Sequence, residues 1–190
     1  MSTLRRAQHF RLRDDREVTV RSAAPTDARA VRALLDGVAA EPSTPILHVP
    51  GSCTLRAMRA EIFQAAAEAD RIMLVARVDG DLVGHLVLVG LGHPFSPHVC
   101  EVGLAVAAGH RRLGVASALM DVALPWAARR PFRRVCAAVF PHNEAALRFF
   151  AVNGFRREGE RNDQYWRDGH YLNEVLLALA VPETEAGAQP

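Results

Sequence analysis

The spacing of apolar residues along the chain predicts where its helices lie. Val31, Leu34, Leu35 and Val38 stand at positions i, i+3, i+4 and i+7, which is one face of a helix, and Thr26 ahead of them is the expected N-cap. The same kind of spacing predicts three further helices, over residues 55–69, from residue 114 onward and over residues 143–153.

Apolar runs and alternating patterns predict the strands between these helices. Residues 72–78 are a nearly unbroken apolar run, as in a strand covered on both faces, and Asp79-Gly80 after it is a typical two-residue hairpin turn. The predicted strands cover residues 17–21, 72–78, 82–91, 99–106, 135–140, 155–161 and 172–180. Because tight turns join the middle strands and helices join the later ones, we predict a mixed α/β (α+β) domain.

Length and charge narrow the function classes. The 190 residues fit one domain, predicted over residues 17–181. Residues 1–16 carry five arginines and no apolar segment, so a mobile basic tail is expected there, and residues 182–190 are expected to be a disordered tail. A net charge of +2 favours no nucleic-acid partner, and no apolar run approaches the about 20 residues that span a membrane.

The cysteines and histidines point to no metal chemistry. Cys53, Cys100 and Cys136 form neither a CxxC pair nor a zinc spacing, so reduced thiols in a cytoplasmic protein are expected. His93 and His98 share a loop, but we favour no metal site there. All 23 basic residues are arginine, which excludes lysine Schiff-base chemistry.

The most informative segment runs from Glu101 to Ser117. An apolar strand leads into a loop with Arg111 and Arg112, and a helix follows at Gly114. The start of a helix leaves roughly four amide N–H groups unpaired and carries about half a positive charge. Gly114 lets a phosphate approach the backbone, and the arginines add cationic donors. We predict a diphosphate site, although solvated arginines at an ordinary loop-to-helix junction would give the same pattern.

Two sequence blocks together resemble the GNAT family of acetyltransferases. The segment RRLGVA, residues 111–116, resembles the family's R/Q-x-x-G-x-G/A signature, and NEAALRFFAVNGF, residues 143–155, resembles its N-x-x-A-x-x-L-Y-x-x-x-G-F pattern. Neither a P-loop nor a G-x-G-x-x-G dinucleotide turn is present. The resemblance covers residues 18–181. It implies that acetyl-coenzyme A is bound by Leu104, Ala105, Val106, Arg111, Arg112, Leu113, Gly114, Val115, Ala116, Ser117 and Asn143. Asn143 is equally expected as a helix N-cap.

The resemblance also implies a specific architecture. The family has a mixed, mostly antiparallel sheet of six to seven strands flanked by about four helices, and its fourth and fifth strands splay apart at a bulge. Here these are the strands at residues 99–106 and 135–140, and Gly103 is the expected place for the bulge. The cofactor's pantetheine arm would fill the gap, and a backbone N–H of the fourth strand would stabilise the oxyanion.

Glu101 is the predicted catalytic base. It is a lone carboxylate in an apolar strand, where burial would raise its pKa, and it would act through a water molecule; the alternative is a structural ion pair with an arginine. The tyrosine that protonates the leaving thiolate in many relatives is replaced by Phe150, and a glutamate base of some relatives by Ala138. Tyr165, Tyr171 or water would then supply the proton, or the thiolate would leave unprotonated.

Two functions remain open at this stage. The first is transfer of acetyl to a primary amine of a small molecule or a protein N-terminus, by direct attack on the thioester. The alternative, favoured by Phe150, is a non-catalytic module that senses acyl-coenzyme A. The loop at residues 41–53 and the turn at residues 162–171 are expected to select the acceptor. Tyr165, Trp166, His170 and Tyr171 around that turn would line a substrate pocket or contact a second copy in a homodimer. His85 is taken as an ordinary strand residue.

Overall fold

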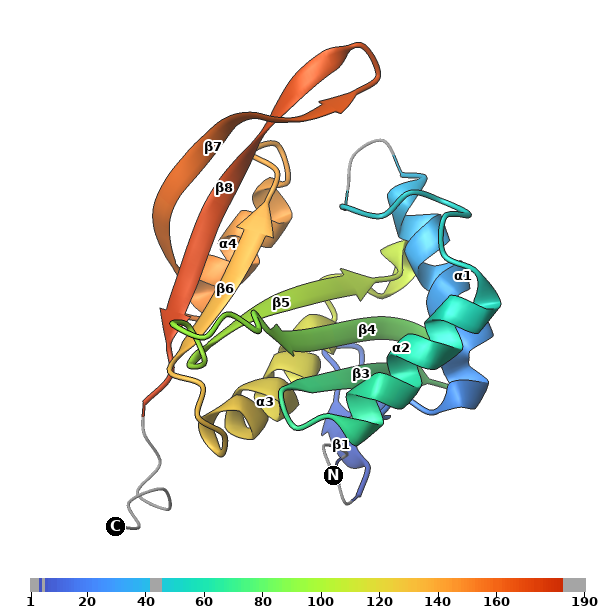
Figure 1. Ribbon diagram of the computed structural model, residues 1–190. Coiled ribbons are helices and arrows are strands. Elements are labelled where there is room, and N and C mark those ends of the chain that lie inside the picture. Colours follow the sequence, from blue (N-terminus) through green and yellow to red (C-terminus); the bar gives the residue numbers. More distant parts are fainter. Residues whose placement is uncertain (1–3, 5, 42–45, 183–190) are drawn as a thin grey trace, which may run out of the picture.

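The protein, described by a computed structural model over residues 4, 6–41 and 46–182, is built on an eight-stranded sheet with helices on both faces (Figure 1). The strand order is β1-β2-β3-β4-β5-β6-β8-β7. The strands are β1 (Gln8–Arg11), β2 (Glu17–Ser22), β3 (Arg71–Val78), β4 (Asp81–Gly90), β5 (Val99–Val106), β6 (Arg134–Val139), β7 (Arg156–Arg167) and β8 (His170–Ala180). The helices are α1 (Ala28–Ala39), α2 (Leu55–Ala67), α3 (Val115–Ala128) and α4 (Glu144–Val152).

The middle of the sheet explains the unbroken apolar run of β3. Alternate residues of β3 face opposite layers: Leu74 packs in the cluster that contains α3, and Val75 packs in the cluster that contains α1 and α2. Both side chains are fully buried, so neither face of the strand tolerates polar residues. The turn at Asp79-Gly80 has positive φ at both residues and joins β3 to β4 as predicted.

Strands β5 and β6 part after a short parallel ladder. Only Val99, Cys100 and Glu101 pair with β6, whereas β5 is antiparallel to β4 along its whole length. The predicted splay is therefore confirmed, and Figure 1 shows the two strands diverging. The bulge predicted at Gly103 is wrong, because the β4–β5 register runs through that residue without a shift. Beyond this ladder β6 stays in the sheet through β8, which pairs with its other edge from Arg134 to Val139.

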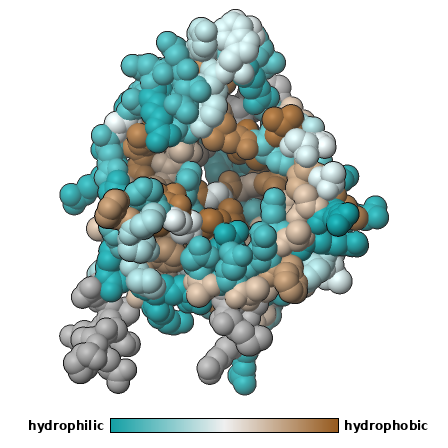
Figure 2. All heavy atoms as spheres, in the orientation of Figure 1, coloured by the Kyte–Doolittle hydropathy of each residue, from teal (hydrophilic) through white to brown (hydrophobic). Residues whose placement is uncertain are grey.

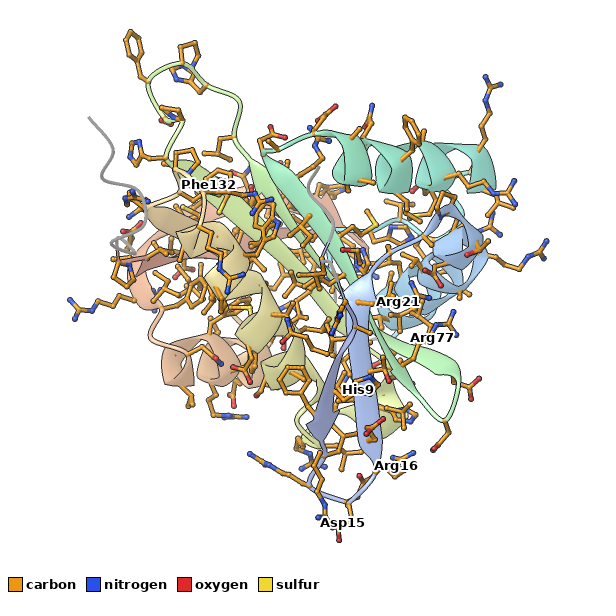
Figure 3. The ribbon with its side chains drawn as sticks, turned by 90° about the horizontal axis from the view of Figure 1, so that it is seen from below. His9, Asp15, Arg16, Arg21, Arg77 and Phe132 are labelled. Atoms are coloured by element: carbon orange, nitrogen blue, oxygen red, sulfur yellow. The ribbon has the colours of Figure 1, made fainter. Side chains whose placement is uncertain are left out.

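The N-terminal segment is not a mobile tail throughout. Residues 8–11 form β1, which pairs with β2 from Gln8↔Val20 to Arg11↔Glu17, and the Leu12 side chain is buried in the core. The prediction of a tail over residues 1–16 is thus wrong for this part, because the arginines alternate with core-facing residues around a polar turn. Figure 3 shows the hairpin projecting with Asp15 and Arg16 at its end. Residues 1–3 and 5 lie outside the described part.

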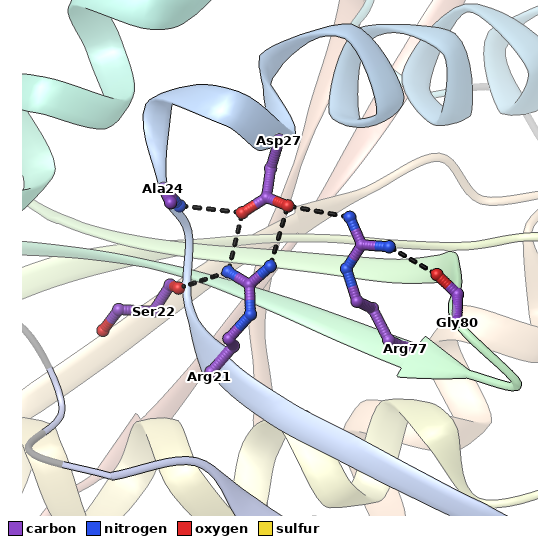
Figure 4. A network of polar contacts seen from close by, with 6 residues as sticks. All are labelled: Arg21, Ser22, Ala24, Asp27, Arg77 and Gly80. Carbon is purple, nitrogen blue, oxygen red and sulfur yellow. Dashed lines mark hydrogen bonds and ion pairs between the residues drawn. The ribbon is translucent and has the colours of Figure 1, made fainter.

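A buried carboxylate fixes the start of α1. The Asp27 side chain accepts hydrogen bonds from both Nη atoms of Arg21 at 2.7 and 2.8 Å, from Arg77 Nη2 at 2.8 Å and from the Ala24 amide at 2.8 Å (Figure 4). Burial alone would raise the pKa of Asp27, but these donors outweigh it and lower the pKa to about 2. Thr26 is therefore not the N-cap; Asp27 closes the first turn instead.

The C-terminal hairpin is longer than the sequence suggests. Strand β7 continues to Arg167 and β8 starts at His170, so the connecting turn is only Asp168-Gly169, with positive φ at both residues. Polar side chains along β7 hid this extension because most of them are exposed. The predicted tail at residues 183–190 lies outside the described residues. Within the described part, no helix is long and apolar enough to cross a membrane.

Candidate active site

The parting of β5 from β6 opens a cavity of about 630 Å³. Figure 2 shows the hollow at the centre of this face, with hydrophobic residues around it. Strands supply one wall through His85, Val87, Val89, Glu101 and Gly103, and α1, α2 and the loop before α2 supply another. The volume matches that of a small-molecule site, which typically encloses about 300–1,000 Å³.

Backbone groups of β5 face the gap at alternate residues. Bonds from the Leu91 amide to the Val99 carbonyl and from the Ala107 amide to the Val83 carbonyl show that odd-numbered residues pair with β4. In an uninterrupted antiparallel ladder the even-numbered residues then point the other way. Leu104 and Val106 therefore direct their backbone N–H groups into the gap, and Ala105 directs its own toward β4. Of the three residues predicted to bind pantetheine through the backbone, two have this orientation.

The loop before α3 presents free amide groups. Gly114, the residue before the helix, has φ of 108°, and Arg112 has φ of 61°. Among the described residues, no hydrogen-bond acceptor is found for the amides of Val115, Ala116 and Ser117. A side chain at Gly114 would meet only Leu12 at 3.8 Å, so the space above this helix start is open. These features suit an anion, as expected for the predicted diphosphate site.

The two arginines of the motif behave differently. Arg111 turns away from α3: its Nη1 and Nη2 atoms bind the Glu41 carboxylate at 2.7 and 2.9 Å, and its Nε donates to the Val106 carbonyl at 3.0 Å. It thereby ties the loop to the end of α1 and occupies a β5 carbonyl beside the gap. Arg112 is exposed, so of the two arginines it is the one that fits the predicted cationic phosphate donor.

Arg13 is a residue that the sequence analysis missed. Its amide donates to the Leu113 carbonyl at 3.0 Å and its Nη1 to the Arg112 carbonyl at 3.3 Å. The β1–β2 turn thus holds the carbonyl side of the loop and leaves the amide side open. Nearby, Arg16 Nη1 lies 3.4 Å from His110 Nε2. The polar run Arg13–Arg16 between two alternating segments was the available signal for a hairpin at this place.

Glu101 lines the cavity but is exposed, so the predicted burial of its carboxylate is wrong. It lies in register with Val89 on β4, which lies in register with Arg71 on β3, so the three side chains share one face of the sheet. Arg71 also lines the cavity, and its Nε binds Glu68 Oε2 at 2.7 Å. Within the described residues Glu101 has no ion pair, which disfavours the structural alternative.

The second sequence block reaches the cavity through α4. Asn143 Oδ1 accepts from the Ala146 amide at 3.1 Å, so the residue is an N-cap, and it also lines the cavity. Phe150 is buried, packs edge-on against Phe155 with ring centroids 4.9 Å apart, and lines the same space. Ala138 lines it as well. No hydroxyl or carboxylate stands at either family position.

Of the two tyrosines considered as proton donors, Tyr165 is the one linked to the cavity. Its hydroxyl donates to Glu174 Oε1 at 2.8 Å, and Glu174 is a buried cavity-lining residue that also accepts from Arg161 at 2.8 Å. Burial, together with this hydrogen bond, raises the pKa of Tyr165 to about 12. Tyr171 is exposed and packs on Trp166, with ring centroids 4.7 Å apart.

The two segments expected to select the acceptor differ in position. From the loop at residues 41–53, Ile46, Leu47 and His48 line the cavity, and His48 Nε2 is held by Asp36 Oδ1 at 2.8 Å. Residues 42–45 lie outside the described part. None of the cavity-lining residues belongs to the turn at residues 162–171. No group of three or more metal-binding side chains occurs in the described residues.

Comparisons with known proteins agree with this geometry. The model of the acetyltransferase (GNAT) family matches residues 44–155. The L-amino acid N-acetyltransferase AaaT of Escherichia coli is 33% identical over 109 residues, which are 55% of this chain and 65% of that protein. The chain therefore spans slightly less than two thirds of that relative.

Solved structures share the fold. YncA of Salmonella typhimurium, solved with its cofactor acetyl-CoA, superposes with a TM-score of 0.78 at 17% identity, covering 91% of this chain and 99% of that one. A GNAT superfamily phosphinothricin acetyltransferase of Sinorhizobium meliloti, solved with acetyl-CoA, gives a TM-score of 0.76 at 16% identity, covering 89% and 94%.

Proposed function

The chain belongs to the GNAT family of acetyltransferases, and we propose that it transfers the acetyl group of acetyl-coenzyme A to a primary amine of a small molecule or a protein N-terminus. The observation that carries this proposal is the gap between β5 and β6, which opens into the cavity and lies beside the unpaired amides of α3. A binding site with this shape accepts an extended, phosphate-bearing arm on one side and an amine on the other.

We infer that different residues bind different parts of the cofactor. The amides of Val115, Ala116 and Ser117 and the exposed Arg112 would hold the diphosphate, because the three amides have no acceptor among the described residues and Arg112 adds a cationic donor. The N–H groups of Leu104 and Val106 would hold the pantetheine arm and the thioester oxygen. Arg111, Leu113, Gly114 and Ala105 would act by shaping the loop and strand. Asn143 would combine its capping role with a contact to the arm.

The chemistry needs a base, an oriented amine and a leaving thiolate. Acetyl-coenzyme A supplies an activated thioester, whose carbonyl carbon bonds to the amine nitrogen while the bond to sulfur breaks. Glu101 lines the cavity as an exposed carboxylate, so we assign it the removal of the amine's extra proton through intervening water molecules. Phe150 donates no proton, so solvent protonates the released thiolate unless Tyr165 moves away from Glu174.

A small amine is the acceptor that the cavity favours. Apolar side chains form most of its lining, and its charged groups are Glu61, Arg71, Glu101 and Glu174. Such a site would hold a free amino acid by its two charged ends. The similarity to an L-amino acid N-acetyltransferase supports this class, and the similarity of residues in a 91-residue segment to a ribosomal protein uS5 alanine N-acetyltransferase of E. coli keeps a protein N-terminus as the second.

The alternative of a non-catalytic acyl-coenzyme A sensor rests on Phe150. A hydrophobic ring stands where the reaction would use a hydroxyl, and it is firmly packed against Phe155. A sensor would keep the phosphate loop and would not need Glu101. Both functions therefore predict binding of the cofactor, but only the acetyltransferase predicts turnover.

Thiol release from acetyl-coenzyme A, measured against L-amino acids and a peptide that begins with alanine, tests the proposal. We expect release with at least one of these amines, and we expect Glu101→Gln to reduce it by about 100-fold, within the usual range for a general base. Glu144→Gln, on the exposed surface of α4, is the matched control. Cofactor binding by calorimetry without release for any amine would favour the sensor.

Location and assembly belong to the same proposal. All three cysteines are free, and burial raises the pKa of the Cys100 thiol to about 12, which suits a reducing compartment such as the cytoplasm.

The Trp166 and Tyr171 residues are 63% and 62% exposed at the end of the β7–β8 hairpin, and we propose that a second copy of the chain covers them. Light scattering in solution distinguishes the dimer from the monomer.

A further inference from the structure

His85 on β4 is a buried polar side chain that lacks a hydrogen-bond partner. The residue is only 5% exposed, and its Nε2 atom has no partner among the described residues. Burial lowers the pKa of the imidazole to about 4, so the ring is neutral near pH 7. A buried polar atom left unpaired typically costs about 1–3 kcal/mol, so a strand position with no role would favour an apolar residue.

The position of His85 places it on the wall of the cavity. The residue lines the cavity directly and lies in register with Ala105 on β5. In a hydrogen-bonded antiparallel pair the two Cα atoms are about 5.5 Å apart. His85 therefore stands level with Leu104–Val106, the part of β5 whose neighbouring N–H groups face the gap. This is the level at which the thioester end of the cofactor is proposed to lie.

Three other polar groups of the cavity already have partners or lie farther along it. Glu174 accepts from Tyr165 and Arg161, and Asn143 caps α4. Glu101 lies four residues before Ala105, or about 13 Å along the strand. His85 is thus the unsatisfied polar side chain beside the proposed reaction point, on the face that α1 and α2 cover.

We propose that His85 binds the acceptor: its imidazole accepts a hydrogen bond from an N–H of the attacking amine and keeps the nitrogen lone pair directed at the thioester carbonyl. The inference rests on the proposed function. An amine at the bottom of an apolar cavity needs an acceptor for its N–H groups, and a neutral ring offers one without repelling an amine that arrives as ammonium. Glu101 then takes the proton through water, and His85 fixes orientation.

Two substitutions separate this role from a structural one. His85→Leu fills similar space without a polar atom, and His85→Gln keeps a hydrogen-bond acceptor. With the amine that the wild-type protein acetylates best, we expect the leucine variant to lose about 10-fold in kcat/KM for the amine. Its KM for acetyl-coenzyme A and its thermal midpoint should not worsen, and the glutamine variant should regain part of the loss. His98→Leu, at an exposed loop position outside the cavity lining, is the control.

Unchanged amine kinetics in His85→Leu would overturn the inference, as would an equal loss of cofactor binding. If that variant fails to fold, the nitrogen-15 signal of the His85 ring in the wild-type protein decides: it should shift when the amine is added to the coenzyme A complex, and no shift would overturn the inference. A wild-type protein that releases no thiol with any amine refutes the proposed function, whereas normal release by both wild type and His85→Leu refutes only the role of His85.

Discussion

Asp27 and His85 are both buried polar residues next to β3, yet their surroundings are opposite. Asp27 is 2% exposed and receives four hydrogen bonds from two arginines and a backbone amide. His85 is 5% exposed and has an unpaired ring nitrogen on the wall of the cavity. The protein satisfies one group completely and leaves the other for something outside the chain. Arg77 Nε is also buried without a partner, so an unpaired atom alone does not mark a residue of the reaction; the position of His85 on the cavity wall is what distinguishes it.

The largest effect is expected when the satisfied group is removed. Asp27→Ala leaves the guanidinium groups of Arg21 and Arg77 without their anion and the Ala24 amide without its acceptor, so we expect a loss of about 3 kcal/mol in the free energy of unfolding. Urea unfolding measures it. Glu144→Ala, which breaks the exposed pair with Arg148, is the control and should cost less than about 0.5 kcal/mol.

The Asp27 carboxylate also makes the free energy of unfolding depend on pH. The pKa of Asp27 is about 2 in the folded protein and lies near 3.8 when unpaired. The stability that its charge contributes is therefore fully present above pH 4 and is lost as the pH falls toward 2, by roughly 2 kcal/mol. Acid unfolding of Asp27→Asn should lack this component. If the two proteins lose stability in parallel over that range, Asp27 is not held as a satisfied ion pair.

Gly114→Glu tests whether the unpaired amides at the start of α3 are left for a ligand, as is proposed for the His85 ring. A carboxylate there would face the proposed diphosphate, and we expect the dissociation constant for coenzyme A to rise at least about 100-fold, or roughly 2.7 kcal/mol. Calorimetry measures it. Gly114→Gln is the control, since it imposes the same backbone strain and nearly the same bulk without the charge. Equal affinities for the glutamate variant and wild type would refute the site.

The smallest effect is expected at Phe150. Phe150→Tyr restores the hydroxyl of the family pattern at a cavity-lining position, so we expect folding to stay intact and turnover not to fall. Thermal unfolding and thiol release measure both. A large drop in turnover with a normal thermal midpoint would show that the packed ring, rather than an absent hydroxyl, is what the reaction needs.

Local sequence patterns predicted most of the architecture because they are set by local physics. The apolar runs of β3, β4 and β5 and the turn at Asp79-Gly80 follow from burial and backbone preference, so they lie where expected. The β1 strand was missed since three of its four residues, Gln8, His9 and Arg11, are polar and obscured a short strand. The reach of β7 was missed because its side chains are mostly exposed and show no apolar period.

The candidate site was predictable where one segment carries it and obscure where distant segments meet. The loop at Gly114 is contiguous in sequence, and the structure leaves its amides open as expected. The Arg111–Glu41 pair spans 70 residues, and the Arg13 contact spans 99, so neither could be read from spacing. Exposure of Glu101 depends on how far β6 departs from β5, which no local pattern encodes.

The three residue pairs that join β5 to β6 divide the sheet into two leaves. One leaf contains β1 to β5, and the other contains β6, β8 and β7. A molecule that enters the gap can contact both leaves and can form hydrogen bonds with strand groups that have no strand partner there. By mass action, a ligand that holds both leaves therefore stabilises the folded protein.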